Sequence, residues 1–336
     1  MPPALHDHAV TALDATRVAT IAAPCPLCGT GGSQPLFAVD GCTSRVVACP
    51  VCGLARLDPL PSDEELARFY PDAYYGDPGT KFQPLVERLV RAVGARHIRF
   101  LARGVPAGGR ILDVGCGRGV LLAELADEGF EVHGVERSAA AALGADPRAQ
   151  IRIASDLVAA AYPADFFDAI FVWHVLEHLR EPVAALREMQ RILRPGGKLV
   201  VAVPNFSSLQ ARWAGPAWFH LDLPRHVFHF PLLALRRLLE QSGFGCESEH
   251  HFSLRQNPFG WVQSSLNRRP DLPRNGLYTL LHRRLPGEQA FFDRTLRWRL
   301  MLAGLIRFPL ALVLTFAEAA LRSGATVHVV ARKPGA

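Results

Sequence analysis

The stretch Arg110-Ile-Leu-Asp-Val-Gly-Cys-Gly-Arg-Gly119 decides the fold of this chain. It opens with apolar residues typical of a buried strand, namely Ile111, Leu112 and Val114. Glycines then alternate with other residues, at Gly115, Gly117 and Gly119, and helical periodicity resumes from Val120. Because glycine accepts backbone conformations that other residues avoid, such a run permits a tight turn against a small ligand. The order of strand, glycine-rich turn and helix predicts a cofactor loop in a doubly wound α/β fold.

Acidic residues near this loop separate two classes of cofactor. A dinucleotide site needs a small residue where this chain has Val120, because the pyrophosphate settles there on the helix N-terminus. Asp113 would repel a pyrophosphate but suits the ammonium group of a methionine moiety. The next predicted strand, 131–135, is followed by Glu136, which is placed to accept hydrogen bonds from both hydroxyls of a ribose. Together these residues favour S-adenosylmethionine over a dinucleotide.

Three further segments continue the alternation of strands and turns. Residues 151–154 predict a third strand, after which Asp156 either accepts a hydrogen bond from an adenine amino group or serves as a solvated cap. Residues 167–173 predict a fourth strand, which runs into His174-Val-Leu-Glu-His178. Residues 193–203 combine a Pro-Gly-Gly turn with a fifth strand.

Through these motifs, residues from about 106 to 254 resemble the class I S-adenosylmethionine-dependent methyltransferases. The resemblance implies a seven-stranded Rossmann-like sheet, with a sixth strand at 246–252 and an antiparallel seventh at 326–331. It also implies S-adenosylmethionine as cofactor. The residues that it places around that cofactor are Asp113, Gly115, Cys116, Gly117, Gly119, Glu136, Arg137, Asp156, Leu157, Trp173 and His174.

Two cysteine knuckles precede this region, Cys25-Pro-Leu-Cys28-Gly and Cys49-Pro-Val-Cys52-Gly. Two residues between the sulfurs and a glycine after them are typical of zinc ribbons, and four cysteines make a closed, structural Zn²⁺ site. Two disulfides are disfavoured because no secretion signal is evident, and free thiols would not explain the duplicated spacing. Cys42, between the knuckles, is interpreted as a small buried residue or a spare ligand.

The 336 residues are long enough for a full doubly wound core with additions. The N-terminal part divides into a flexible tail (1–20), a zinc ribbon (21–58) and a mainly helical connector (59–105) with a capping box at Ser62 and Glu65. The methyltransferase core is predicted at 106–254 and 324–333. Residues 255–323 are a helical insertion before the last strand.

A methyl group on a sulfonium is already activated, so the remaining catalytic task is deprotonation of an acceptor hydroxyl or carbon acid. His226 is the preferred base, because it lies in the aromatic segment 205–230, which follows a strand and resembles a substrate lid. His178 is the second candidate. Its alternative is a purely structural role, held by Glu177 or a backbone carbonyl.

The insertion combines a basic and an apolar segment. Residues 255–299 hold nine arginines against three acidic residues, a net charge of +6, and residues 300–316 are almost wholly apolar. We do not expect a membrane span, because Arg307 and Pro309 interrupt the segment and the last strand must return to the sheet. The insertion either lies on an anionic membrane surface or grips a lipid-linked acceptor, or, as the favoured alternative, packs on the core with a solvated arginine face.

The order of cysteine knuckles and methyltransferase motifs resembles enzymes that methylate carbon atoms of nucleotide-linked sugars. Those enzymes carry a long additional C-terminal domain that we do not expect here, and this departure weakens the case for a carbon acceptor and leaves oxygen methylation open. We therefore expect a cytoplasmic enzyme, either free or associated with a membrane surface, that methylates oxygen or carbon of a sugar, glycan or lipid-linked envelope intermediate. RNA methylation, with the ribbon holding RNA, is the alternative suggested by a pI of about 9.1. It is disfavoured because lysine is scarce and the basic excess sits in one insertion. A non-catalytic cofactor-binding scaffold is a second alternative, and the oligomeric state stays open.

Overall fold

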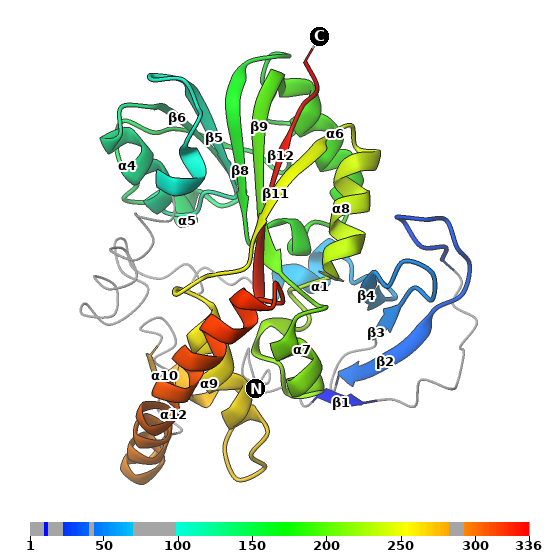
Figure 1. Ribbon diagram of the computed structural model, residues 1–336, viewed down its shortest axis with the longest axis vertical. Helices are drawn as coiled ribbons and strands as arrows, with labels where there is room; N and C mark the ends of the chain where they lie inside the picture. The colour runs from blue at the N-terminus through cyan, green and yellow to red at the C-terminus, as the bar shows by residue number, and fades with distance from the viewer. Residues whose placement is uncertain (1–9, 13–22, 40–43, 70–98, 282–291, 336) are drawn as a thin grey trace.

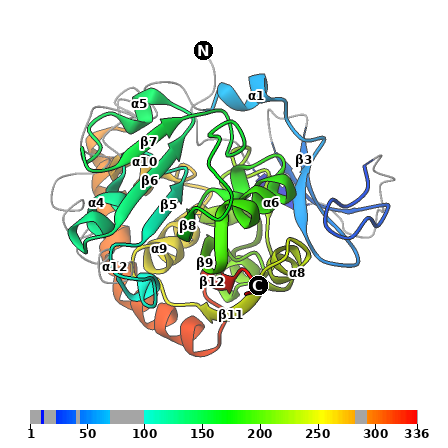
Figure 2. The ribbon, with the colours of Figure 1, turned by 90° about the horizontal axis from the view of Figure 1, so that it is seen from above.

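The computed structural model describes residues 10–12, 23–39, 44–69, 99–281 and 292–335 (Figure 1). These residues form one seven-stranded sheet and one five-stranded sheet. Helices flank the larger sheet, the smaller sheet lies to one side of it, and a group of helices extends from one end (Figures 1 and 2). Cys42 and residues 70–98 of the predicted connector lie outside the described residues.

The seven-stranded sheet has the order β11-β12-β9-β8-β5-β6-β7. Its strands are β5 (Arg110–Val114), β6 (Glu131–Glu136), β7 (Gln150–Ile153), β8 (Phe167–Trp173), β9 (Leu193–Pro204), β11 (Gly245–His250) and β12 (Thr326–Arg332). β12 pairs antiparallel with both β9 and β11, and the other pairings are parallel. The predicted doubly wound fold with an antiparallel last strand is confirmed.

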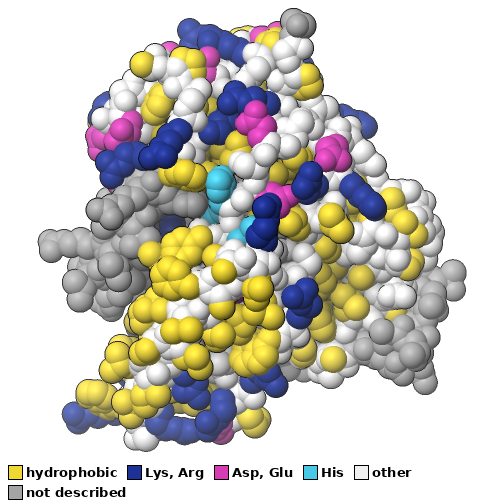
Figure 3. All heavy atoms as spheres, in the orientation of Figure 1, with side chains coloured by type: hydrophobic (Ala, Val, Ile, Leu, Met, Phe, Trp, Pro, Cys, Tyr) yellow, Lys and Arg dark blue, Asp and Glu magenta, His cyan; other side chains and the backbone are white. Residues whose placement is uncertain are grey.

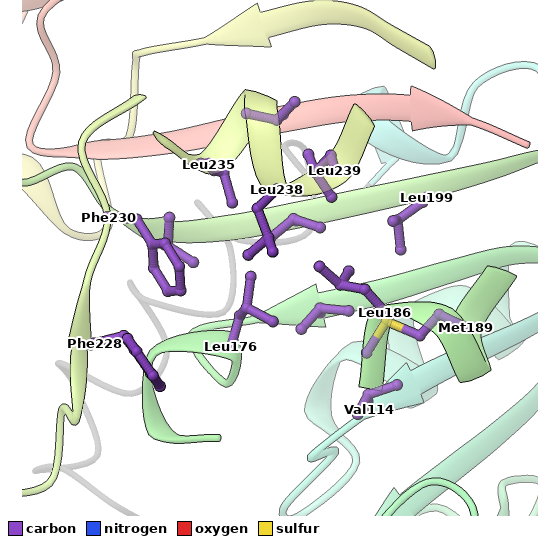
Figure 4. Packing of buried hydrophobic residues seen from close by; sticks show 14 of the residues in the cluster. Val114, Leu176, Leu186, Met189, Leu199, Phe228, Phe230, Leu235, Leu238 and Leu239 are labelled. Carbon is purple, nitrogen blue, oxygen red and sulfur yellow. The ribbon is translucent and has the colours of Figure 1, made fainter. Parts of the chain in front are cut away.

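Helices cover both faces of this sheet, as a buried parallel sheet requires. They are α4 (Val120–Asp127), α5 (Ala139–Ala142), α6 (Pro182–Ile192) and α8 (Leu232–Gln241). On one face, Leu186 of α6 and Leu235 of α8 belong to the same buried cluster as Val114 and Leu199 (Figure 4). On the other, Leu122 of α4 packs with the strand residues that point the opposite way.

The five-stranded sheet has the order β1-β2-β3-β4-β10. Its strands are β1 (Val10–Ala12), β2 (Gln34–Val39), β3 (Arg45–Ala48), β4 (Ala55–Asp58) and β10 (Phe228–His229). β1 lies within the predicted flexible tail, where pairing with β2 makes three residues an edge strand instead. β10 comes from the predicted lid and pairs with β4, so the sheet joins two distant parts of the chain. Helix α1 (Asp63–Ala67) follows, and its capping box is the one predicted at Ser62 and Glu65.

The lid, defined as residues 205–230, contains α7 (Leu209–Ala214) and two short 3-10 helices, η2 (Gly215–Ala217) and η3 (Phe219–Leu221). The predicted insertion is helical and consists of α9 (Asn257–Asn267), α10 (Gly276–Leu281) and α12 (Arg294–Ala320). These three helices share a small apolar core of their own, which includes Trp261, Leu277 and Leu300. The helix α12 runs on through Pro309.

Candidate active site and cysteine cluster

The glycine loop leaves the carboxyl end of β5, as predicted. Gly115, Gly117 and Gly119 have φ angles of 70°, 49° and 65°, in the left-handed region that favours glycine. A Cβ atom on Gly115 would lie 2.5 Å from a methyl carbon of Val175, so this glycine is also needed for packing against the loop after β8. A Cβ atom on Gly117 would meet nothing within 4 Å, which means that this position faces open space. The loop therefore presents bare backbone to that space.

Two carboxyl groups adjoin the loop. One oxygen of Glu136 accepts a hydrogen bond from the amide of Gly117 at 2.9 Å, and the other accepts from the amide of Arg137 at 2.8 Å. Asp113 is buried on β5, and burial, followed by the charge of Glu136, raises the pKa of its carboxyl group well above the usual value. A cationic ligand beside Asp113 would relieve this cost. The environment suits the predicted contact with an ammonium group.

The remaining predicted cofactor residues lie on neighbouring turns. Cys116 and Leu157 are buried, whereas the side chain of Arg137 is exposed. Asp156 is exposed and accepts hydrogen bonds from the amide of Ala159 at 2.8 Å and the hydroxyl of Ser155 at 2.9 Å. These bonds lower its pKa and correspond to the cap that we considered as the alternative to adenine recognition.

β8 ends at Trp173, and His174 reverses the chain with a φ of 53°. The next residues form η1 (Leu176–His178), which turns Glu177 into the protein interior. An oxygen of Glu177 lies 3.2 Å from Nδ1 of His174. The sequence indicates Glu177 only as a support for His178. In the structure it is the central charge of the site, a role that the His-x-x-Glu-His spacing could have indicated.

The lid brings His226 to the same place. Nε2 of His226 lies 3.9 Å from an oxygen of Glu177 and 3.7 Å from an oxygen of Asp222. The ring of His178 lies edge-on to that of His226, with 4.5 Å between the ring centroids. The two predicted bases therefore share one site, which we call the acid–histidine cluster. It comprises His174, Glu177, His178, Asp222 and His226.

Backbone carbonyls fix the orientation of both candidate bases. Nδ1 of His226 lies 2.9 Å from the carbonyl oxygen of His220, and Nδ1 of His178 lies 3.0 Å from that of Arg225. Because a carbonyl only accepts hydrogen bonds, each Nδ1 carries a proton and donates it. Burial, together with the charge of His226, lowers the pKa of His178 to about 4. His178 is consequently neutral near pH 7.

Several buried polar atoms around the cluster lack a hydrogen-bond partner among the described residues. They are Oε2 of Glu177 and Nε2 of His174, His220 and His229. Burial lowers the pKa of both His220 and His229 to about 3. Buried polar atoms are normally paired, so this set indicates a place for a polar ligand or water. The ligand atoms of Glu177, His178 and His226 also lie within 4.8 Å of one another, a spacing at which they could share a divalent cation.

The four predicted zinc ligands form a second cluster. The sulfurs of Cys25 and Cys52 are 3.6 Å apart and those of Cys28 and Cys49 are 3.5 Å apart, too far for disulfides. Four thiolates around one Zn²⁺, each with a Zn–S distance of ~2.3 Å, would lie roughly 3.8 Å apart, so the arrangement fits a tetrahedral site. The two knuckles also share a turn geometry, in which the amide of the following glycine donates to the carbonyl of the first cysteine.

The two clusters are linked through the backbone of Val227. The amide of Leu57, on β4, donates to the carbonyl of Val227 at 2.9 Å, and the amide of Val227 donates to the carbonyl of Glu177 at 2.9 Å. The cysteine-bearing sheet therefore holds the lid residue next to His226 against the loop that carries Glu177.

Comparison with known proteins agrees with this geometry. Residues 85–249 match the family described as "Methyltransferase domain". A ubiquinone biosynthesis O-methyltransferase from Xanthomonas axonopodis pv. citri is 35% identical over 138 residues, which are 38% of this chain and 58% of that protein. The enzyme of the same name from Alkalilimnicola ehrlichii is 31% identical over 153 residues, 43% of this chain and 60% of that protein. The chain thus spans little more than half the length of these curated relatives.

Among solved structures, the [4+2]-cyclase SpnF is similar with a TM-score of 0.52 and 20% identity, covering 82% of this chain and 97% of that one. At this identity the likeness concerns the fold alone. The family match, the curated relatives, the strand order and the glycine loop with its acidic residues all agree. We conclude that residues 85–249 carry a methyltransferase domain, with the sheet order and glycine loop of the class I S-adenosylmethionine-dependent enzymes.

Proposed function

We propose that this protein transfers the methyl group of S-adenosylmethionine to a hydroxyl oxygen of a small-molecule acceptor, a sugar, glycan or lipid-linked intermediate. The observation that carries the proposal is the acid–histidine cluster, in which Nδ1 of His226 donates to the carbonyl of His220 and Nε2 lies 3.9 Å and 3.7 Å from oxygens of Glu177 and Asp222. The curated relatives are named O-methyltransferases, which favours oxygen over the carbon acceptor that we also considered.

The cluster lies next to the cofactor loop. Gly115 packs against Val175, and Val175 belongs to the same loop as Glu177. Since β5 and β8 are neighbouring parallel strands, their carboxyl ends meet at one edge of the sheet. A methyl group held at the glycine loop and an acceptor held at the cluster would therefore face each other.

In the proposed reaction, the acceptor oxygen attacks the methyl carbon while the carbon–sulfur bond breaks. The electron pair of that bond stays on sulfur, which yields S-adenosylhomocysteine and a methyl ether. The hydroxyl proton passes to Nε2 of His226. Glu177 and Asp222 stabilise the imidazolium that results, because their oxygens lie 3.9 Å and 3.7 Å from Nε2.

We further propose that Cys25, Cys28, Cys49 and Cys52 hold a structural Zn²⁺. Four cysteine ligands leave no open position for substrate, so the metal would stabilise the ribbon rather than take part in methyl transfer. A stable ribbon would also hold the lid in place, because β4 pairs with β10 and the amide of Leu57 donates to the carbonyl of Val227. In this way the zinc would position the acceptor side of the site.

The test is transfer of radiolabelled methyl from S-adenosylmethionine to cell-envelope extracts, with total RNA in a parallel reaction. Label in an extractable small molecule or glycan supports the proposal, whereas label in RNA would replace it with the RNA alternative. Cofactor binding without any transfer would support the scaffold alternative.

The variant His226→Ala should bind S-adenosylmethionine normally in calorimetry but lose about 10²-fold or more in turnover. His250→Ala, on β11 outside the cluster, is the matched control and should keep its rate. Full turnover by His226→Ala would refute the assignment of the base. If chelation abolished turnover and Mg²⁺ restored it, a cation bound at the cluster would take over the role that we assign to His226 as the base.

A further inference from the structure

The helix α12 exposes an apolar surface that the methyltransferase fold does not require. Its solvent-exposed large apolar residues are Trp298, Met301, Leu302, Leu305, Ile306, Phe308, Leu310, Val313 and Phe316. Their exposed fractions run from 43% at Phe308 to 73% at Leu305. Figure 3 shows the corresponding hydrophobic area over the lower half of the molecule, where α12 lies in Figure 1. We call these nine residues the exposed face of α12.

The other side of α12 is packed against the insertion. Its buried residues are Leu300, Gly304, Ala311, Thr315 and Glu318. Glu318 accepts a hydrogen bond from the indole of Trp261 on α9 at 2.9 Å, and Gly304 lies against Leu277 on α10. An ordinary surface helix buries its apolar stripe and exposes its polar one, so α12 has the reverse arrangement. The helix is packed as the favoured expectation has it, and Arg294, Arg297 and Arg299 are exposed, but apolar residues make up most of its exposed side.

The charges of α12 lie at its ends. Residues 294–322 contain five arginines against Glu318 alone, a net charge of +4. Arg294, Arg297 and Arg299 lie at the N-terminal end of the face, where Arg299 pairs with Asp271 at 2.5 Å, and Arg322, which pairs with Glu249 at 3.0 Å, follows its C-terminal end. Between Met301 and Phe316 the one charged residue is Arg307, whose guanidinium donates to the carbonyl of Ala303 on the same helix at 3.1 Å. A partner surface that complements this face would be apolar opposite the middle of the helix and negatively charged opposite its ends.

We propose that the exposed face of α12 seats the protein on an anionic lipid bilayer, with the helix lying in the plane of the interface. Apolar side chains would enter the boundary between headgroups and acyl chains, and the arginines would meet the anionic headgroups. The helix is long and apolar enough to span a membrane, with 22% of its most apolar window buried. A span is nevertheless disfavoured, because one side is packed on α9 and α10 and β12 begins at Thr326, in the sheet.

A second copy of the chain fits this face less well than a membrane does. If two copies met in parallel, the arginines of one N-terminal end would lie against those of the other. If they met antiparallel, Arg294, Arg297 and Arg299 would approach Arg322 of the other copy. Asp271 and Glu249 already pair with Arg299 and Arg322 of the same copy, and neither arrangement supplies a further acidic residue on the face to compensate Arg294 and Arg297.

One helix, α9, separates α12 from the lid residues that adjoin the acid–histidine cluster. α9 packs against α12 on one side and against η3 of the lid on the other. The hydroxyl of Ser264, on α9, accepts a hydrogen bond from the amide of Phe219 at 3.0 Å, and Gly260 lies against His220. Membrane binding would thus bring the lid to the lipid surface. If the protein transfers methyl groups as proposed above, an acceptor at the lipid surface would be the lipid-linked intermediate rather than a free sugar or glycan. This inference about the acceptor rests on the proposed function.

The experiment is co-sedimentation of the full chain with vesicles of phosphatidylcholine alone or with 30% phosphatidylglycerol. Wild-type protein should bind the anionic vesicles about tenfold more strongly, and added salt should weaken this binding. Leu305→Glu should lose at least about tenfold in anionic-vesicle binding, since it places a negative charge at the centre of the face. Leu233→Glu is the matched control, because Leu233 is 69% exposed on α8, and it should bind as wild type does.

Equal, weak binding of wild type to both kinds of vesicle would overturn the proposal, and so would unchanged binding by Leu305→Glu. A concentration-dependent dimer in sedimentation that Leu305→Glu disrupts, without vesicle binding, would assign the face to a second copy. Calorimetry with S-adenosylmethionine shows whether each variant is folded. Vesicle binding needs no turnover, so failure of the membrane seat and failure of methyl transfer can be told apart.

Discussion

The substitution Glu177→Gln tests the site most directly. It preserves the shape of the side chain but removes the charge at the centre of the acid–histidine cluster. Burial would raise the pKa of Glu177, but the hydrogen bond with His174 and the charges of the surrounding histidines bring it down to about 2. The carboxyl group is therefore ionised at any working pH, and glutamine removes a full negative charge.

The size of the effect follows from the distance between the two groups. An imidazolium at His226 and a carboxylate 3.9 Å away attract each other by about 4 kcal/mol at an effective dielectric constant of about 20. If that attraction developed wholly in the transition state, its loss would slow turnover about 10³-fold. Asp222 stays in place at 3.7 Å and offsets part of the loss. We expect kcat to fall between about 10²- and 10³-fold, with S-adenosylmethionine binding unchanged.

The assay is single-turnover methyl transfer at saturating cofactor, with calorimetry to measure cofactor affinity. Glu188→Gln is the matched control, since Glu188 is also a buried glutamate but pairs with Arg191 on α6. The control should lose stability and keep its single-turnover rate. A Glu177→Gln enzyme with wild-type turnover would show that the cluster is structural and that our mechanism is wrong.

Three further predictions follow from the structure. Gly117→Val should abolish S-adenosylmethionine binding, because its side chain enters the open space beside the loop, and its φ of 49° should lower the melting temperature. Gly115→Ala should also lower the melting temperature, because its φ is 70° and its Cβ would lie 2.5 Å from Val175; an unchanged melting temperature in Gly115→Ala would contradict this. Cys49→Ser should reduce the bound zinc measured by mass spectrometry. It should also lower kcat more than it lowers cofactor affinity, because β4 pairs with β10 of the lid; a zinc-free enzyme with full kcat would show that the ribbon does not position the lid. The free energy of unfolding should fall between pH 7 and pH 5. In the folded protein His220 and His229 have pKa values of about 3 and stay neutral, whereas in the unfolded chain each has a pKa of about 6.5 and binds a proton in this range. At pH 5 each histidine should cost about 2 kcal/mol in urea unfolding, and a flat profile, or an unchanged slope in His229→Asn, would refute this.

Much of the fold was predictable from the sequence, because the signals involved are local. A strand followed by alternating glycines and a helix can be recognised within ten residues, and β5, α4 and their loop lie where that pattern indicates. The paired cysteines are equally local, since each knuckle needs a fixed number of residues between its sulfurs. Whether each predicted cofactor residue touches S-adenosylmethionine stays a prediction.

Only the tertiary structure decided which distant groups meet. The sequence indicated His178 and His226 as separate candidates, but their joint site with Glu177 depends on the lid folding back over the end of β8. The two-residue strand β10 could not be foreseen, because so short a segment is a strand only when β4 is beside it.

Contacts between distant residues also decide which side of α12 is exposed to solvent. Periodicity shows that a helix has two sides but not which side its neighbours cover, and here α9 and α10 cover the side with Gly304, Thr315 and Glu318. The sequence by itself therefore determined the doubly wound sheet, the cofactor loop and the cysteine pairs. The tertiary structure decided the acid–histidine cluster, the link between ribbon and lid, and the face that α12 turns outward, since each depends on contacts between residues far apart in the chain.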